Sequence, residues 1–220
     1  MIITSVERQP RRRRANVFVD GEFVMAVGLE VAAERDVRPG RSISQDELSS
    51  LAEADERRTA VDAALRLISY RPRSERELRQ RLARKGIRPA VREETLGRLR
   101  EMGYLDDAAF ARFWVETKQA ASPRSKRLLA VELRQKGIER ETAEEATGEL
   151  SDEDAAYEAA TRRLRSLGGL AYGAFRERLG AFLTRRGFAY EVARKTVDRC
   201  WAELEEGQGS GVMGQGMADG

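Results

Sequence analysis

The chain repeats itself at an interval of about 50 residues, and this repeat restricts its fold more than any other feature of the sequence. Residues 72–87 (PRSERELRQRLARKGI) share nine identities with residues 123–138 (PRSKRLLAVELRQKGI), at a constant offset of 51. A weaker third copy, 50 residues further on, retains Leu179, Leu183 and Gly187. Several coincidences at one period indicate a repeat architecture, in which each unit buries its apolar face against its neighbours.

Each copy predicts three helices. The first is amphipathic, and in the first two copies Pro72 or Pro123 then interrupts the chain, because proline disfavours helix at the residue before it. Ser74 and Ser125 are positioned to cap the second helix, which carries one leucine per turn and ends at a glycine. The glycines that end the three second helices are Gly86, Gly137 and Gly187. We therefore predict a mainly α-helical protein with three tandem three-helix repeats in an elongated array.

The repeats have predicted boundaries. We expect the first repeat, with a helix ahead of it, to occupy residues 44–103. The second and third repeats are expected at residues 104–151 and 152–206. The glycine-rich residues 207–220 lack any periodicity, and such a composition predicts a disordered tail.

Residues 1–43 predict a small β-hairpin module instead of helix. Two apolar segments, residues 15–19 and 22–27, flank Asp20-Gly21, a dipeptide that favours a two-residue hairpin turn. This register places Phe18 opposite Phe23 as a cross-strand aromatic pair. The four arginines at residues 11–14 have two readings: a solvated loop, or a positively charged tip that attracts nucleic acid or an acidic protein.

Histidine is absent from the chain and cysteine occurs once. These two facts exclude Ser-His and Cys-His nucleophile pairs, histidine-based zinc sites and a disulfide framework. We interpret Cys200 as a small apolar residue. No stretch approaches the roughly 18 apolar residues of a membrane span, and the first residues do not have the pattern of a secretory signal. We expect a cytoplasmic protein that contacts no membrane.

Carboxylates are the only residues that could build a metal site, at Asp106-Asp107, Asp152–Asp154 and Glu93-Glu94. A Mg²⁺-dependent nuclease is therefore a remote alternative. Asp106 and Asp152 are better explained as residues at helix starts, where a carboxylate is favoured. We predict no catalytic residue, no metal and no cofactor. The aromatic residues Tyr104, Phe110 and Trp114 could stack on bases, but their spacing favours packing in the helical core.

The net charge of +3 is the difference between 40 basic and 37 acidic residues, and these are unevenly distributed. Residues 71–100 and 162–199 are mainly basic, whereas residues 139–158 are mainly acidic. A solvated surface would explain such runs. Several cations nevertheless recur one repeat later, and a repeated row of cations suits an extended polyanion or a polymeric protein partner. The predicted contact residues are Arg73, Arg76, Arg84, Lys85, Arg124, Lys126, Arg127 and Lys136.

The order of these motifs resembles the RecX family of regulatory proteins. The resemblance is carried by residues 99–111 (LREMGYLDDAAFA), by residues 133–138 (LRQKGI) and by a set in the first repeat. That set is Ser74, residues 77–79 (ELR), Leu82 and residues 85–87 (KGI).

The resemblance implies a protein that binds RecA and the RecA–single-stranded DNA filament, lies in the filament groove, and inhibits or destabilises it. Such a protein would modulate recombination, DNA repair and the SOS response. We expect it to act as a monomer, with at most weak direct binding to DNA. The alternative that the residues themselves leave open is a stand-alone helical-repeat protein that binds single-stranded nucleic acid. Direct binding of that kind would depend strongly on salt, because it releases counterions.

Overall fold

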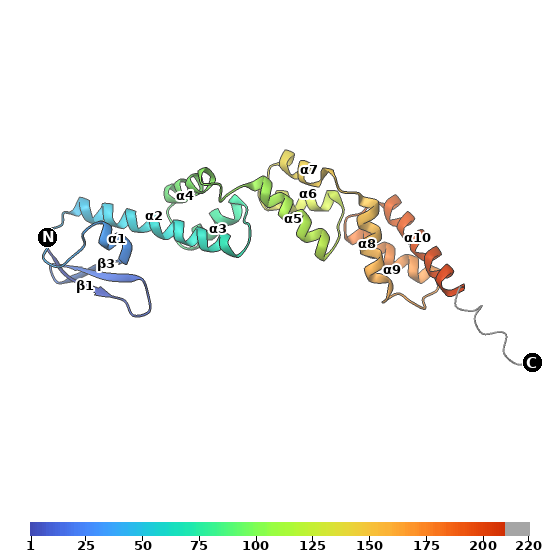
Figure 1. Cartoon of the computed structure of the whole chain (residues 1–220), viewed down its shortest axis with the longest axis horizontal. Helices are drawn as coiled ribbons and strands as arrows, with labels where there is room; N and C mark the ends of the chain where they lie inside the picture. Colours follow the sequence, from blue (N-terminus) through green and yellow to red (C-terminus); the bar gives the residue numbers. More distant parts are fainter. Residues whose placement is uncertain (210–220) are drawn as a thin grey trace, which may run out of the picture. The chain divides into compact units, whose positions relative to one another are not determined.

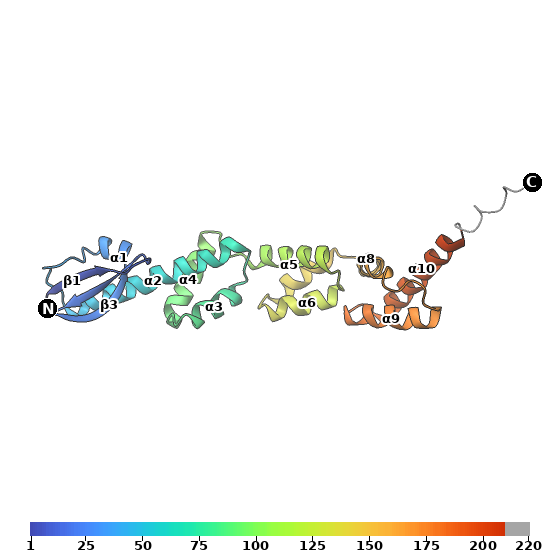
Figure 2. The same ribbon diagram turned by 90° about the horizontal axis from the view of Figure 1, so that it is seen from below.

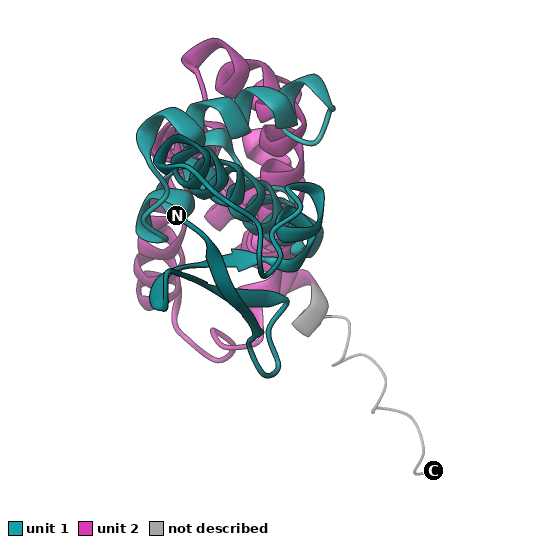
Figure 3. Ribbon diagram, turned by 90° about the vertical axis from the view of Figure 1, so that its left-hand side faces the viewer, with its two compact units in different colours: residues 1–106 teal, residues 107–220 magenta. Residues whose placement is uncertain are grey.

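The structure is a computed structural model, and it describes residues 1–209. The chain divides into two compact units, residues 1–106 and the residues from 107 onward (Figure 3). Among the described residues, no helix combines the length and the apolar character that a membrane span requires.

The N-terminal module is a three-stranded antiparallel sheet in the order β1-β2-β3. Its strands are β1 (Ile3–Arg8), β2 (Arg14–Val19) and β3 (Glu22–Gly28). The predicted hairpin is confirmed: β2 and β3 are joined at Asp20-Gly21, and Phe18 pairs with Phe23. The two rings meet edge to face with their centroids 5.8 Å apart. A short helix, α1 (Leu29–Glu34), follows β3.

The long helix α2 (Gln45–Tyr70) belongs to both the sheet module and the first repeat. It begins with a capping box in which Ser44 and Glu47 satisfy each other's backbone N–H groups, as the sequence pattern predicts. Leu48 and Leu51 on its first half pack with the sheet, whereas Ala60 and Ala64 on its second half pack with the first repeat. The helix expected ahead of the first repeat is thus continuous with the first helix of that repeat (Figure 1).

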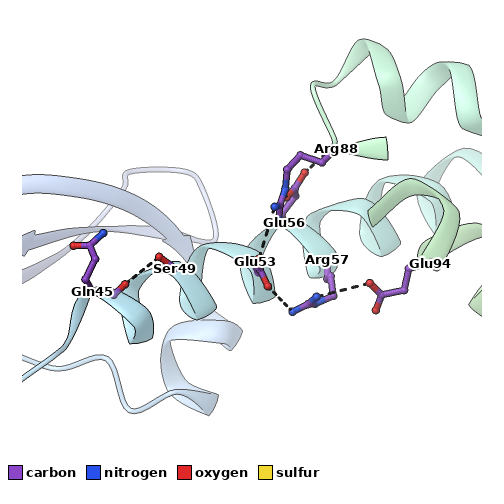
Figure 4. A network of polar contacts seen from close by, with 7 residues as sticks. All are labelled: Gln45, Ser49, Glu53, Glu56, Arg57, Arg88 and Glu94. Atoms are coloured by element: carbon purple, nitrogen blue, oxygen red, sulfur yellow. Dashed lines mark hydrogen bonds and ion pairs between the residues drawn. The ribbon is translucent and has the colours of Figure 1, made fainter. Parts of the chain in front are cut away.

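The first repeat is completed by two shorter helices, α3 (Glu75–Arg84) and α4 (Pro89–Glu101). Leu78, Leu82, Leu96 and Leu99 are almost completely buried between them and α2. Ion pairs hold α4 to α2 at the surface of this core (Figure 4). Arg88 donates to Glu56 at 2.6 Å, and Arg57 lies between Glu53 and Glu94.

The second and third repeats have the same plan and lie within the second unit (Figures 1 and 2). The prediction of three tandem three-helix repeats behind a small β module is therefore confirmed. The helices of the second repeat are α5 (Asp107–Ala121), α6 (Lys126–Gln135) and α7 (Arg140–Gly148). Those of the third repeat are α8 (Asp152–Leu164), α9 (Tyr172–Arg185) and α10 (Tyr190–Gly209).

The helix ends follow the predicted residues, and Asp152 is the first residue of α8, as expected. The Ser74 and Ser125 hydroxyls accept hydrogen bonds from backbone N–H groups three residues later, at 3.2 Å each. Gly86, Gly137 and Gly187 all have positive φ angles. Ser151 caps α8, and the Asp152 carboxylate also accepts a hydrogen bond from the backbone N–H of Lys126.

The C-terminal end of the fold differs from the sequence-based boundary. The disordered tail was expected from residue 207, but α10 continues to Gly209. The remainder of that expected tail, residues 210–220, lies outside the described residues. Cys200 on α10 is fully buried beside Phe175 and Val197, which confirms its interpretation as an apolar core residue.

Candidate functional site

The eight predicted contact cations fall into two groups in the structure. One group lies on the solvent-exposed surface of α3 and α6 and consists of Arg76, Arg84, Lys85 and Arg127. The other group is partly buried and consists of Arg73, Arg124, Lys126 and Lys136. The two groups differ in what their charged atoms contact, and this difference decides which cations are free to meet a partner.

Arg73 is held inside the first repeat. Its side chain is only 14% exposed, its Nε donates to the Leu67 carbonyl at 3.3 Å, and its Nη1 lies 3.8 Å from the Glu77 carboxylate. Burial, together with the nearby charge of Arg71, lowers the pKa of Arg73 from its ordinary value. The guanidinium therefore stabilises the turn between α2 and α3.

Arg124 and Lys136 are occupied around a tryptophan in the second repeat. Arg124 forms an ion pair with Glu132, and the Trp114 indole donates to the same carboxylate at 3.2 Å. The ammonium of Lys136 lies 4.8 Å from the centroid of the Trp114 ring, within the range of a cation–π interaction. These groups connect α5 to α6 and support the repeat from within.

The three aromatic residues have different environments. Phe110 is 1% exposed and Trp114 is partly buried beside it, with ring centroids 6.0 Å apart, so both pack in the core as predicted. The prediction is wrong for Tyr104, which is 52% exposed. It follows Gly103, whose positive φ of 74° turns the chain out of α4, and Leu105 takes the buried position instead.

Arg186 joins the third repeat to the second, a role that the sequence analysis missed. Its guanidinium donates to the Ser122 hydroxyl and to the Pro123 carbonyl, and it lies 4.5 Å from the Phe182 ring. Its backbone carbonyl accepts a hydrogen bond from Ser125 at 3.1 Å. Burial, with the nearby charge of Arg124, lowers the pKa of Arg186. Its place before the repeated glycine was visible in the sequence, but its contacts were not.

Lys126 also links repeats, although it was predicted as a contact residue. Its backbone N–H donates to Asp152 Oδ1 and its ammonium to the Gly148 carbonyl, each at 2.8 Å. Arg162 on α8 adds a further bond to the Ala120 carbonyl at 2.9 Å. The second and third repeats are thus connected by several hydrogen bonds beyond their apolar cores.

The arginines of residues 11–14 also include both exposed and partly buried side chains. Arg14 faces inward and donates to Asp55 and to the Ala26 carbonyl, both at 2.6 Å. Arg13 is 84% exposed and pairs with Glu30 at 2.9 Å. Arg12 and Arg13, with Arg8, line a hollow of about 560 Å³ beside α1. Three of these four arginines are exposed, which agrees with both a solvated loop and a charged tip, and Arg14 is structural.

The acidic pairs considered for a metal site are dispersed. Glu93 pairs with Arg79, Glu94 faces Arg57, and Asp152 is bonded to the backbone of Lys126. Within residues 1–209, no group of three or more carboxylate or cysteine side chains gathers in a way that could hold a metal ion. The arrangement therefore offers charge and shape for binding, and it gives the nuclease alternative no support.

A cationic groove of about 500 Å³ lies between α6 and α7 in the second unit. Lys126, Arg127, Arg134 and Arg140 line it, together with Glu144. Arg140 donates to Glu144 at 2.7 Å, and this hydrogen bond raises the pKa of Arg140. Two of the eight predicted cations, Lys126 and Arg127, are thus brought together with two arginines that the prediction did not include.

Comparison with known protein families gives four matches along the chain. Residues 1–44 match the regulatory protein RecX N-terminal domain. Residues 60–99, 106–146 and 151–197 match the first, second and third three-helix domains of RecX. The order and spacing of these domains follow the module and the three repeats of the structure.

Individual relatives agree with the domain matches. Regulatory protein RecX from Bacillus subtilis is 29% identical over 208 residues, covering 93% of this chain and 79% of the relative. Regulatory protein RecX from Lactobacillus johnsonii is 28% identical over 209 residues, covering 93% and 77%. A crystal structure of regulatory protein RecX superimposes with a TM-score of 0.62 at 24% identity, covering 90% of this chain and 98% of the other. At that identity the superposition supports the fold.

Proposed function

This chain belongs to the RecX family of regulatory proteins, and on that premise we propose that it binds RecA and the RecA–single-stranded DNA filament. It would lie in the filament groove and inhibit or destabilise the filament, and so modulate recombination, DNA repair and the SOS response. It would do so in the cytoplasm as a monomer, without a catalytic residue, a metal or a cofactor.

The observation that best supports this proposal is a pair of exposed cations at the same place in two successive repeats. Arg76 on α3 and Arg127 on α6 lie 51 positions apart and are both exposed. Arg84 and Lys85 add two exposed charges at the end of α3. Cations repeated along a chain of similar modules suit a partner that itself repeats. We therefore assign partner contact to these four cations ahead of Arg73, Arg124, Lys126 and Lys136.

The effect on the filament follows from differential affinity. A ligand that binds two states equally shifts nothing, however tightly it binds. The protein would destabilise the filament only if it binds a state with fewer or differently arranged RecA protomers more tightly than the growing polymer. Such a mechanism requires binding energy and shape, and no chemistry at the partner.

The proposal is tested by the DNA-dependent ATPase activity of RecA. We expect inhibition at protein concentrations far below those that coat the DNA, together with a shorter lifetime of RecA filaments on single-stranded DNA. An unchanged filament lifetime at these concentrations would contradict the proposal.

The second candidate is a stand-alone protein that binds single-stranded nucleic acid, which the exposed arginines of residues 11–13 favour. This candidate predicts inhibition only after the free DNA is saturated. It also predicts that the effect disappears at moderate salt, because neutralised phosphates release their counterions. A titration at two salt concentrations separates the two candidates.

A further inference from the structure

The groove between α6 and α7 has a counterpart in the third repeat. A smaller groove of about 120 Å³ lies between α9 and α10. Each of its eight lining residues lies 50 positions after a residue that lines the larger groove. Gly180, for example, replaces Ala130, and Tyr190 replaces Arg140. The groove is therefore a property of the repeat and lies between the second and third helices, beside a small residue, Ala130 or Gly180.

The first repeat carries a different residue at the same place. Arg79 of α3 corresponds to Ala130, and its guanidinium bridges the two helices. It donates to Glu75 at 2.5 Å and to the two oxygens of Glu93 at 2.8 and 3.0 Å. In the first repeat the Arg79 side chain, held between the carboxylates of Glu75 and Glu93, thus occupies the position that is open in the second repeat.

The second-repeat groove carries more positive charge than the corresponding place in the first repeat. Lys126 stands where the first repeat has Glu75, and Ala130 where it has Arg79. Four cations surround a single carboxylate, Glu144, in this groove. A carboxylate of the first repeat is thus replaced by a cation, and the one carboxylate that lines the groove, Glu144, accepts a hydrogen bond from Arg140 at 2.7 Å. The groove has the charge of a site for an anionic group from outside the chain.

The shape of the groove favours a helix of a protein over nucleic acid. Its lining includes the small or branched apolar residues Ala130, Val131 and Ala143, and no aromatic residue on which a base could stack. Small residues along a groove allow a helix to approach closely. Arg127 and Arg134 are seven residues apart on α6, which corresponds to about 10 Å along the helix. Two carboxylates seven residues apart on a docked helix have the same separation.

We propose that the α6–α7 groove docks an acidic amphipathic helix of the protein partner. Two glutamates or aspartates of this helix, two turns apart, meet Arg127 and Arg134, and an apolar side chain between them covers Ala130. The inference rests on the proposed function in one respect, because it takes that partner to be RecA. It adds that this groove binds protein and does not bind DNA.

The test uses a variant of the full chain that copies the first repeat. Lys126→Glu with Ala130→Arg recreates the Glu75–Arg79 pair beside Glu144, the counterpart of Glu93. The first repeat folds with these residues; the variant loses the bond from the Lys126 ammonium to the Gly148 carbonyl but keeps the backbone bond to Asp152. Arg112→Ala on exposed α5 is the control, because it changes the net charge by the same amount away from the groove. Circular dichroism establishes that both variants are folded.

Three ligands are compared by fluorescence anisotropy at low salt. They are a helical peptide with leucines flanked by glutamates seven residues apart, the same peptide with glutamines, and an oligo(dT) single strand. We expect the wild-type chain to bind the glutamate peptide at least tenfold more tightly than the glutamine peptide. The groove variant should lose at least tenfold in affinity for the glutamate peptide, Arg112→Ala less than twofold, and oligo(dT) affinity should not change.

Two results would overturn the inference. If the groove variant keeps its affinity for the glutamate peptide, the groove is not the docking site. If its affinity for oligo(dT) falls as much as its affinity for the peptide, the groove is a nucleic-acid site.

Inhibition of the RecA ATPase then separates this inference from the proposed function. A variant that loses the peptide but still inhibits RecA refutes RecA as the partner of the groove. A wild-type chain that binds the peptide but never affects RecA refutes the proposed function and leaves the docking site standing.

Discussion

Gly187, which ends α9 in the third repeat, lies directly against Ser125, which caps α6 in the second. A Cβ on Gly187 would come within 2.6 Å of the Ser125 hydroxyl oxygen and 2.7 Å of the Leu128 Cβ. The glycine is therefore required twice, for its positive φ of 87° and for the contact between repeats. Gly86 has a similar φ of 79°, but no atom lies within 4 Å of the place where its Cβ would be.

Gly187→Ala should destabilise the second unit by more than Gly86→Ala destabilises the first. The left-handed conformation costs an alanine about 1–2 kcal/mol at either position. At Gly187 the displacement of Ser125 and Leu128 adds a packing cost of about 1–3 kcal/mol. Urea denaturation followed by circular dichroism measures both effects. Equal losses for the two variants would show that the contact between repeats contributes nothing.

Asp55→Ala should weaken the attachment of the β-sheet to α2. The carboxylate is 10% exposed, pairs with Arg14 at 2.6 Å and accepts the Gly28 N–H at 2.7 Å. Its removal leaves a half-buried guanidinium and a backbone donor without this partner, at a cost of about 2–4 kcal/mol. Thermal unfolding provides the measurement.

The matched control for Asp55→Ala is Arg13→Ala in the same module. Arg13 pairs with Glu30, but its side chain is 84% exposed. An exposed ion pair contributes less than about 1 kcal/mol, so this variant should unfold close to the wild-type temperature. A similar drop in unfolding temperature for both variants would mean that burial does not determine how much these ion pairs contribute to stability.

Cys200 should be unreactive until the protein unfolds. Burial raises the pKa of the Cys200 thiol to about 11, so the thiolate that attacks a disulfide reagent is scarce at pH 8. We expect no labelling of the folded chain by such a reagent at pH 8 and complete labelling in denaturant. Rapid labelling without denaturant would contradict the burial of this residue.

The same shift predicts an alkaline loss of stability. Because the thiol has a higher pKa in the folded chain than in the unfolded chain, its contribution is fully present below the unfolded pKa of about 8.5. The contribution is lost as the pH rises toward about 11. Over this range the thiol of the unfolded chain ionises while the thiol of the folded chain still keeps its proton. Cys200→Ala should lower the stability at pH 7 and flatten this part of the pH profile.

Exposed and buried cations of the first repeat should respond differently to substitution. Arg76, Arg84 and Lys85 are exposed, so their joint replacement by glutamine should leave the unfolding temperature within about 2 °C, since surface changes cost little. Inhibition of the RecA ATPase should fall at least tenfold.

Arg73→Gln should instead lower the unfolding temperature, because it removes the bond to the Leu67 carbonyl. A loss of stability in the triple variant equal to that of Arg73→Gln would remove the distinction between the two groups.

Local signals in the sequence predicted the fold well. Ser44 with Glu47, Ser74 and Ser125 cap helices because each needs only a partner three residues away. Asp20-Gly21 turns the hairpin because its backbone angles are intrinsic to those residue types. The repeat supplied the rest, since the same leucine and glycine spacing must fold in the same way three times.

The sequence alone thus determined the repeats, their helix boundaries to within a few residues, the hairpin and the absence of histidine chemistry. Only the tertiary structure decided which cations are available. Arg73 and Arg76 have the same charge and lie three residues apart, yet one is 14% exposed and bonded to Leu67 while the other is exposed to solvent. Likewise, Arg186 reaches Ser122 across 64 positions. Charge and helix propensity are properties of each residue type, whereas burial and long-range pairing depend on how helices distant in the sequence pack together.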